Sequence, residues 1–303
     1  MSIPDTTPEM TGDILKVLLR SEGRRRLLME IARERVITTS ELVRRTGLRR
    51  QTVNEYVKEF EEAGLVAIKK GQKPWIVIAS EDLEYFLLGL PVATAKIHRL
   101  EYPCSWEEFP ECILKRGELS VAFIWGARGL TVAKAHDAVG VPELLTSIIF
   151  RALDHGVSRD KVSVVSALDY EAVASVDVLE RDIFLIGSGL VNLLTARLLE
   201  LLRPPIRFEP PVGRELLSEL TGTLYSAGDE VKRNAALLAL LPNPWAPGRI
   251  AIVAAGIFRH GTRAALKALE RHVRNRFIED HAKGVPLRVI RATPEGEFDG
   301  FFE

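Results

Sequence analysis

The sequence predicts an α/β protein built from two different parts. Helical runs followed by a β-hairpin, an α+β arrangement, occupy residues 1–90, whereas strand-like and helical runs alternate over residues 118–303. The length of 303 residues fits two domains of about 150 residues each. With 47% apolar and 27% charged residues, the composition is that of a folded globular chain. Residues 91–117 contain Pro, Cys and Trp with little periodicity, and we expect them to form a linker.

Helix signals follow one another closely in the N-terminal part. Apolar residues recur at helical spacing over residues 11–35, with one break that divides them into two helices. Thr38 followed by Glu41 predicts a capping box at the start of a short helix over residues 40–45. Gly47 is placed to end this helix in the left-handed conformation.

A longer helix and a hairpin complete this part. Residues 50–63 carry an apolar face that runs from Val53 to Phe60 at helical spacing. Two short β-branched runs, at residues 65–68 and 75–78, then flank a basic, glycine-containing tip at residues 69–74. We expect a helix with one buried face, followed by a β-hairpin with a positively charged tip.

This order of elements resembles the winged helix-turn-helix transcription regulators of archaea and bacteria. Residues 39–66 follow their sequence pattern over almost its whole length, including Thr46-Gly47-Leu48, Thr52-Val53 and Gly64-Leu65-Val66. Where these proteins usually have a serine at the start of the recognition helix, Arg49 removes a helix cap and adds a positive charge. The resemblance implies a DNA-binding domain, with the helix over residues 50–63 in the major groove and the wing, residues 69–74, on phosphates.

The outer face of this domain has the side chains that read DNA. Arg binds guanine with two hydrogen bonds, Gln and Asn do the same with adenine, and Lys and Arg contact phosphates. The alternative is a solvated charged face that contacts other proteins. The predicted DNA-binding residues are Arg44, Arg45, Arg49, Arg50, Gln51, Thr52, Asn54, Lys58, Lys69, Lys70 and Lys73.

Two further features suggest that the chain acts as a homodimer. One winged helix reaches only a few base pairs, so that specific binding usually requires two half-sites. A predicted helix over residues 81–90 is too apolar to be left on a free surface, and we expect it to be buried between domains or subunits.

The C-terminal part predicts an α/β domain with a mostly parallel sheet, suited to sensing or dimerisation. Segments around residues 182–192 and 241–265 resemble the α/β domains of archaeal S-layer-type proteins, which implies a shared fold and no shared activity. The strands are expected at residues 121–125, 162–165, 183–186, 250–255 and 287–290, and the helices at 142–153, 190–202 and 262–277.

Two glycine-containing turns in this part each follow a strand and precede a helix. Backbone N–H groups at such turns bind anions, and two turns at one edge of a parallel sheet would form a crevice. The sequence therefore suggests an anionic small-molecule effector, although both segments also fit purely structural turns. The candidate ligand-binding residues are Gly187, Ser188, Gly189, Asn192, His260, Gly261, Thr262 and Arg263.

Several other functions are not supported by the sequence. It contains no zinc-binding or histidine-pair motif, no nucleophile motif and no Walker A loop, so we expect no metal, no cofactor and no enzymatic activity. Neither a membrane-spanning run nor a secretory signal is found. Cys104 and Cys112 are too few for a disulfide scaffold and favour a reducing, cytoplasmic setting. The high Arg content and the scarcity of Asn and Gln are typical of a thermophile.

The formal net charge is zero, but residues 1–80 contain 15 Lys and Arg against 11 Asp and Glu. A uniformly basic coat for nucleic acid is thereby excluded, whereas a basic N-terminal domain is not. The leading hypothesis is a sequence-specific regulator of transcription. An architectural, chromatin-like DNA-binding protein and a nucleotide-binding module with an accessory winged helix are the alternatives.

Overall fold

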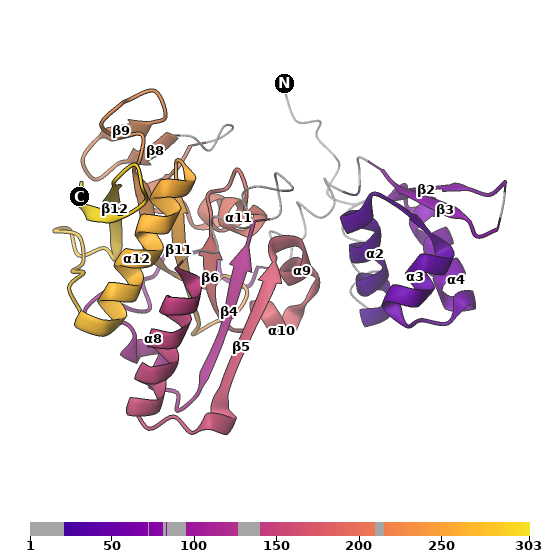
Figure 1. Cartoon of the computed structure of the whole chain (residues 1–303), viewed down its shortest axis with the longest axis horizontal. Coiled ribbons are helices and arrows are strands. Elements are labelled where there is room, and N and C mark those ends of the chain that lie inside the picture. Colours follow the sequence, from indigo (N-terminus) through magenta and orange to yellow (C-terminus); the bar gives the residue numbers. More distant parts are fainter. Residues whose placement is uncertain (1–20, 72, 81–82, 84–94, 127–139, 210–214) are drawn as a thin grey trace. The chain divides into compact units, whose positions relative to one another are not determined.

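The computed structural model describes residues 21–71, 73–80, 83, 95–126, 140–209 and 215–303 (Figure 1). They belong to two compact units, Met1–Ala93 and Thr94–Glu303, each with a hydrophobic core of its own. The predicted helix before residue 21 and nearly all of the predicted apolar helix over residues 81–90 lie outside the described residues. The expected role of the second of these helices in a dimer therefore stays a prediction.

The described part of the first unit is made of three helices and a small antiparallel sheet with the strand order β1-β3-β2. Its core includes Leu27, Ile31, Val53 and Val57, whose side chains have no exposed surface. The predicted hairpin is present, whereas the third strand is only three residues long and shows no alternation in the sequence. The elements are α2 (Glu22–Glu34), β1 (Val36–Thr38), α3 (Thr39–Thr46), α4 (Arg50–Glu62), β2 (Val66–Lys69) and β3 (Ile76–Ala79).

The ends of the short helix α3 follow the sequence signals in part. The Thr38 hydroxyl accepts a hydrogen bond from the Glu41 N–H at 3.2 Å, and Gly47 ends the helix in the left-handed conformation with a φ of 70°. The Glu41 carboxylate, predicted to return to the Thr38 backbone, binds Arg44 and Arg45 instead. Only one half of the predicted capping box is therefore confirmed.

The second unit is built on a seven-stranded sheet with the order β13-β12-β10-β11-β6-β4-β5. Strands β5, β4, β6 and β11 are parallel neighbours, and antiparallel pairing joins β11, β10, β12 and β13. The sheet is therefore mixed, and the prediction of a mostly parallel sheet is wrong. The strands are β4 (Leu119–Trp125), β5 (Val162–Leu168), β6 (Asp182–Ile186), β10 (Ala236–Pro242), β11 (Ile250–Gly256), β12 (Leu287–Ala292) and β13 (Phe298–Phe301).

The interior strand β10 explains why the sequence did not predict the antiparallel half of the sheet. Its residues are mainly Ala and Leu, which prefer helices, and all seven are buried, so they show no alternation. A short apolar run of this kind does not distinguish a buried strand from a buried helix. Once β10 lies beside β11, the second half of the sheet becomes antiparallel.

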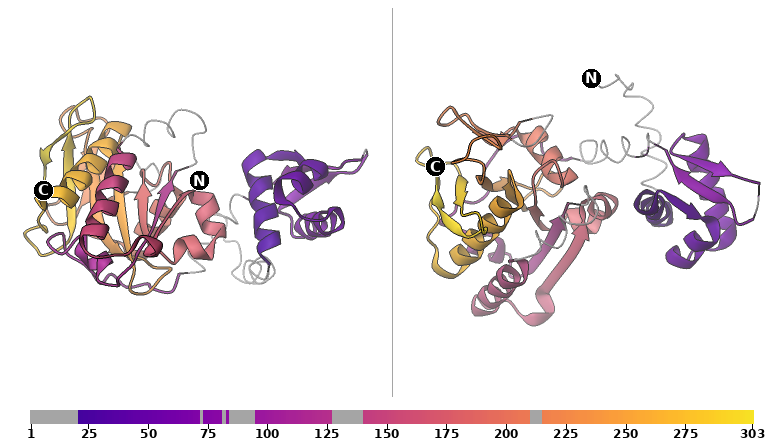
Figure 2. Two further views of the ribbon diagram at one scale, coloured as in Figure 1. Left: turned by 60° about the horizontal axis from the view of Figure 1, so that its bottom comes forward. Right: turned by 45° about the horizontal axis from the view of Figure 1, so that its top comes forward.

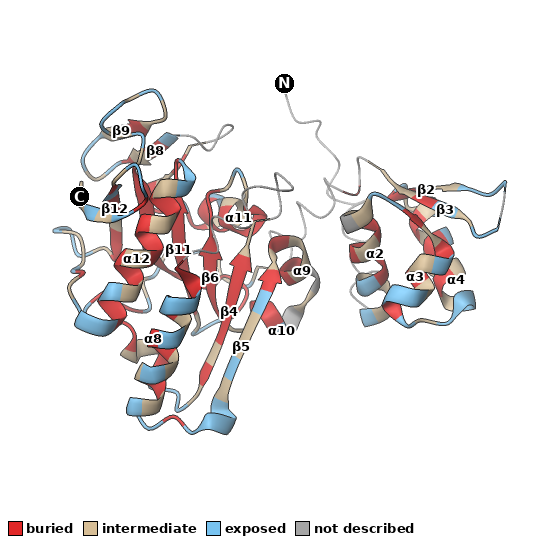
Figure 3. Ribbon diagram, viewed as in Figure 1, coloured by how far each residue is buried: buried red, intermediate tan, exposed pale blue. Residues whose placement is uncertain are grey.

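Two long helices, α8 (Val141–Asp154) and α12 (Arg259–Asn275), lie side by side on one face of the sheet (Figures 1 and 2). Their inward sides are buried and their outer sides are exposed (Figure 3). The other described elements of this unit are α6 (Glu111–Leu114), a 3-10 turn (Arg159–Lys161), α9 (Asp169–Ala174), α10 (Val176–Leu179), α11 (Leu193–Leu202), and a small antiparallel sheet of β7 (Ile206–Phe208), β8 (Glu215–Ser218) and β9 (Thr223–Ser226).

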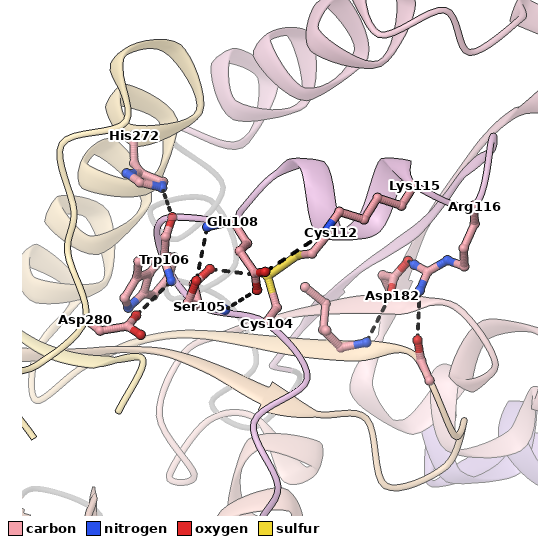
Figure 4. Close-up of a disulfide and its surroundings, with 12 residues drawn as sticks. Cys104, Ser105, Trp106, Glu108, Cys112, Lys115, Arg116, Asp182, His272 and Asp280 are labelled. Carbon is pink, nitrogen blue, oxygen red and sulfur yellow. Dashed lines mark hydrogen bonds and ion pairs between the residues drawn. A yellow bond between two sulfur atoms is a disulfide. The ribbon is translucent and has the colours of Figure 1, made fainter. Parts of the chain in front are cut away.

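The segment predicted as a linker, residues 91–117, is in large part a piece of the second unit. Trp106 and Phe109 are fully buried in its core, and the backbone N–H of Trp106 donates to Asp280 at 2.8 Å (Figure 4). Aromatic residues without periodicity pack here as an irregular loop, a pattern that the sequence does not distinguish from a linker. The predicted linker is therefore wrong from at least Cys104 onward.

The two cysteines form a disulfide, which corrects the expectation that both are reduced. The loop folds back through α6 and brings the Cα atoms of Cys104 and Cys112 to 6.1 Å (Figure 4), a separation that a disulfide requires. Beside it, His272 is fully buried and contacts the Trp106 carbonyl oxygen through Nε2 at 2.9 Å. The bridge thus joins the start of this unit into one packed cluster.

Candidate functional site

The start of α4 presents the side chains that sequence analysis assigned to base reading. Arg49, Arg50 and Gln51 are exposed, while Thr52 and Asn54 are half-buried. Arg49 occupies the N-cap position without a side-chain hydrogen bond to the helix, so its guanidinium is not used for capping. The opposite side of the helix is held in the core by Val53, Val57 and Phe60, as predicted, whereas Tyr56 is only half-buried.

Acidic neighbours compensate some of the predicted cations. Arg45 forms ion pairs with Glu30, Glu34 and Glu41, and Arg44 also binds Glu41. Hydrogen bonds from Arg44 and then Arg45 lower the pKa of the Glu41 carboxyl to about 2. Because three carboxylates surround its guanidinium, Arg45 is poorly placed for the phosphate contact that the sequence suggested.

The wing shows the same difference between paired and unpaired cations. Lys70 donates to Glu61 at 2.7 Å, and the Lys58 ammonium lies 5.8 Å from the centre of the Trp75 ring. Lys69 and Lys73 are exposed and have no acidic partner among the described residues. The sequence analysis did not identify these acidic partners, although Glu41 lies three and four residues before Arg44 and Arg45, the spacing of helical ion pairs.

In the second unit, the two predicted glycine turns lie next to each other. Strands β6 and β11 are parallel neighbours, so the turns that follow them emerge at the same edge of the sheet. A cavity of about 590 Å³ opens there, with Ser188 from the first turn and His260 and Thr262 from the second among its lining residues. The adjacency that a shared site requires is therefore present.

Close backbone packing explains the glycines of the second turn. A Cβ atom on Gly256 would approach the Thr262 nitrogen to 2.4 Å, and one on Gly261 would approach the Ala235 oxygen to 2.8 Å. The Thr262 hydroxyl also accepts a hydrogen bond from the Gly256 N–H at 2.9 Å. These residues shape the cavity by joining the end of β11 to the start of α12.

Two of the candidate ligand-binding residues have other roles. Asn192 is fully buried, donates to the carbonyl oxygens of Ile124 and Ile186, and accepts from two N–H groups of α11, so its side chain has no group left for a ligand. Arg263 lies 3.6 Å from Glu297 and lines a different hollow, on the outer side of α12. Both assignments are corrected.

Other residues of the cavity were not assigned from the sequence. Arg233, Asn234 and Arg259 line it. Arg259 donates through Nε to His260 Nε2 at 3.3 Å. Arg259 is adjacent in sequence to His260 and the second glycine turn, so its position could have been inferred from the sequence. Arg233 comes from the loop before β10, a strand that the sequence did not predict.

A comparison with protein families gives a match that lies within the first unit. Residues 21–73 match the model of the MarR family. The match includes α2, α3, α4, β2 and the start of the wing, and it supports a DNA-binding transcription regulator with a helix-turn-helix. Among curated proteins, none matches the chain.

The MarR-like segment covers 53 of the 303 residues, and the second unit lies outside it. Within the described ranges, no helix is long and apolar enough to cross a membrane. The same ranges contain no group of three or more His, Cys, Asp or Glu side chains arranged to hold a metal ion. The two candidate functional sites are the outer face of the MarR-like segment and the cavity of the second unit.

Proposed function

We propose that the chain is a sequence-specific regulator of transcription that binds double-stranded DNA, with α4 in the major groove and the wing, residues 69–74, on phosphates. The main support for this proposal is a group of unpaired cations. Four exposed cations at the start of α4 and on the wing have no carboxylate partner among the described residues: Arg49, Arg50, Lys69 and Lys73. Unpaired cations that flank a helix with an exposed N-terminal face fit the phosphates and base edges of a duplex.

The contacts are expected to divide by position. Arg50, Gln51 and Asn54 lie within about one turn of the start of α4, the end that reaches base edges in helix-turn-helix proteins. Lys69 and Lys73 flank the tip of the wing and would contact phosphates without reading sequence. Arg44, Lys58 and Lys70 would also contact phosphates. Each of them must first separate from its partner in the structure, which is Glu41, Trp75 and Glu61 respectively.

We further propose that the chain forms a homodimer and has no enzymatic activity. We propose that it acts in the cytoplasm, where it binds the chromosome. A dimer would present two copies of α4 to half-sites about one helical turn, or 34–36 Å, apart. The disulfide between Cys104 and Cys112 is compatible with this setting, because intracellular proteins of hyperthermophiles retain disulfides. A monomeric mass in solution at micromolar concentration would contradict the dimer.

The experiment that tests the function is a genome-wide map of DNA bound by the full chain. A sequence-specific regulator should protect discrete, short sites that share a motif with two half-sites. An architectural protein, the alternative, should give long footprints with little sequence preference. The absence of DNA binding at low salt would contradict both.

A further inference from the structure

We propose that the cavity between the ends of β6 and β11 binds a small organic anion, in which a carboxylate or phosphate group is attached to an apolar body. The cavity measures about 590 Å³, within the range of small-molecule sites. It belongs entirely to the second unit, so the proposal does not depend on DNA binding.

The charges around the cavity have one sign. Arg233 and Arg259 reach it from two separate segments of the chain, and no Asp or Glu is among the described residues that line it. The Arg233 guanidinium has no ion pair or hydrogen bond within the described parts of the chain. Many of the other described arginines of this unit do have a carboxylate partner, for example Arg249 with Glu118. An uncompensated arginine beside a cavity attracts an anion.

The backbone adds donors on the same side. Helix α12 starts at Arg259 in the wall of the cavity, and its N-cap residue Phe258 provides no side-chain hydrogen bond. The neighbouring helix α11 is different, because Asn192 and Asp169 accept hydrogen bonds from its first N–H groups. In α12 the N–H groups of Gly261 and Thr262 donate to the Phe258 oxygen, whereas the Arg259 N–H has no partner among the described residues and can donate to an anion.

A hydroxyl in the wall of the cavity supports the same assignment. Ser188 lines the cavity and is only 5% exposed, yet its side chain has no hydrogen-bond partner within the described residues. Its backbone oxygen holds the turn by accepting from Val191 and Asn192. The Ser188 hydroxyl is therefore available to donate a hydrogen bond to a group that enters the cavity.

The walls define the rest of the ligand. Leu190 and Phe258 are 41% and 39% exposed, and both line this cavity, together with Val191, Ile257 and Pro294. Large apolar side chains that border a cavity are covered when an apolar group binds. An inorganic ion would leave them uncovered. We therefore infer an anionic head near Arg233 and Arg259 and an apolar body along Leu190 and Phe258.

The test is calorimetric titration of the full chain with hexanoate, hexyl phosphate, 1-hexanol and inorganic phosphate. We expect one of the two organic anions to bind, and its identity will separate a carboxylate site from a phosphate site. Arg233→Ala and Arg259→Ala should each weaken that binding about tenfold or more, as expected for a charge-assisted hydrogen bond of at least about 1.4 kcal/mol. Ser188→Ala should weaken it by a smaller factor.

Arg159→Ala is the matched control, because Arg159 is exposed and precedes β5 at the opposite edge of the sheet. It should bind the anion like the original chain. Equal binding of 1-hexanol, binding of inorganic phosphate alone, no binding of either organic anion at millimolar concentration, or unchanged affinity in both arginine variants would overturn the proposal. DNA binding measured on the same samples shows separately whether the proposed regulator function holds.

Discussion

Glu61 holds Lys70 of the wing against α4, with Lys70 Nζ 2.7 Å from Glu61 Oε2. The other carboxylate oxygen, Oε1, accepts from the backbone N–H of Ile68 at 3.2 Å. One carboxylate therefore connects the end of α4 to the first strand of the hairpin and neutralises a cation that DNA would otherwise meet. Lys69 and Lys73, on either side of the wing tip, have no such partner among the described residues.

Glu61→Gln should strengthen DNA binding. The amide keeps an oxygen that accepts from Ile68, while the ion pair with Lys70 is lost and its ammonium becomes available for a phosphate. A gain of one phosphate contact steepens the slope of log affinity against log salt by about 0.9. Fluorescence anisotropy with a labelled duplex at several salt concentrations measures this slope. A shallower slope or weaker binding in the variant would show that Lys70 does not face DNA.

Arg50→Ala should change which sequences are bound. A side chain that contacts a base edge contributes about 1–3 kcal/mol of discrimination at one position, and its loss relaxes preference there. Arg44→Ala is the control, because Arg44 lies on α3 and pairs with Glu41. It should weaken all sequences alike. Selection from a random duplex library compares the two variants, and an identical motif for Arg50→Ala and the original chain would rule out base reading by Arg50.

His272 should make the second unit less stable in mild acid. Burial lowers the pKa of His272 below its ordinary value of 6.5, so the ring is neutral at pH 7. Its Nδ1 atom accepts from the Ile278 N–H, so Nε2 donates to the Trp106 carbonyl, and a second ring proton would break the first bond. The pKa of His272 is lower in the folded chain than in the unfolded chain, where it has its ordinary value of 6.5. At pH values between these two, the unfolded chain binds more protons than the folded one, so the free energy of unfolding falls as the pH drops below about 6.5.

Urea unfolding at pH 7.5 and 5.5 measures this effect. His272→Gln is the comparison, because it removes the titrating ring and retains a donor and an acceptor. The original chain should lose more stability between the two pH values than the variant does. Equal losses would mean that His272 does not titrate in this range.

Reduction of the disulfide should destabilise the second unit. Cys104 and Cys112 are separated by eight positions. A disulfide that closes a loop of this length lowers the entropy of the unfolded chain and thereby raises the free energy of unfolding by about 2–3 kcal/mol. Thermal or urea unfolding with and without a phosphine reductant measures the difference. The double variant Cys104→Ser with Cys112→Ser should be insensitive to the reductant. An unchanged unfolding midpoint in the reduced original chain would contradict a structural role for the bridge.

The first unit was the more predictable from the sequence, because its signals are local. Thr38, Gly47 and the apolar spacing from Val53 to Phe60 each determine a cap or a face within one helix. Glu30 and Glu34, which pair with Arg45, and Glu61, which pairs with Lys70, were not foreseen, because they lie on α2 and α4 and depend on how the elements pack. The sequence therefore predicted which positively charged side chains lie on this surface, but not which of them are free of carboxylate partners and able to bind DNA.

The second unit depends on contacts between residues far apart in the chain. Strand β10 is fully buried and has no alternating pattern, so neither its position nor the antiparallel half of the sheet follows from the sequence. The two glycine turns were recognisable, but the contribution of Arg233 to the cavity depends on where β10 begins. Likewise, Trp106 belongs to the core only because His272 and Asp280 lie opposite it.

Binding of duplex DNA by the unpaired cations at the start of α4 and on the wing can be tested directly. The most direct measurement is the affinity of the full chain for a duplex, across a range of salt concentrations, before and after changing Arg49, Arg50, Lys69 and Lys73 together to Ala. We expect the variant to keep its fold, judged by circular dichroism, and to lose most of its affinity. Its salt slope should fall by up to about 0.9 for each phosphate contact removed. Unchanged affinity and slope in a folded variant would show that DNA is bound elsewhere or not at all.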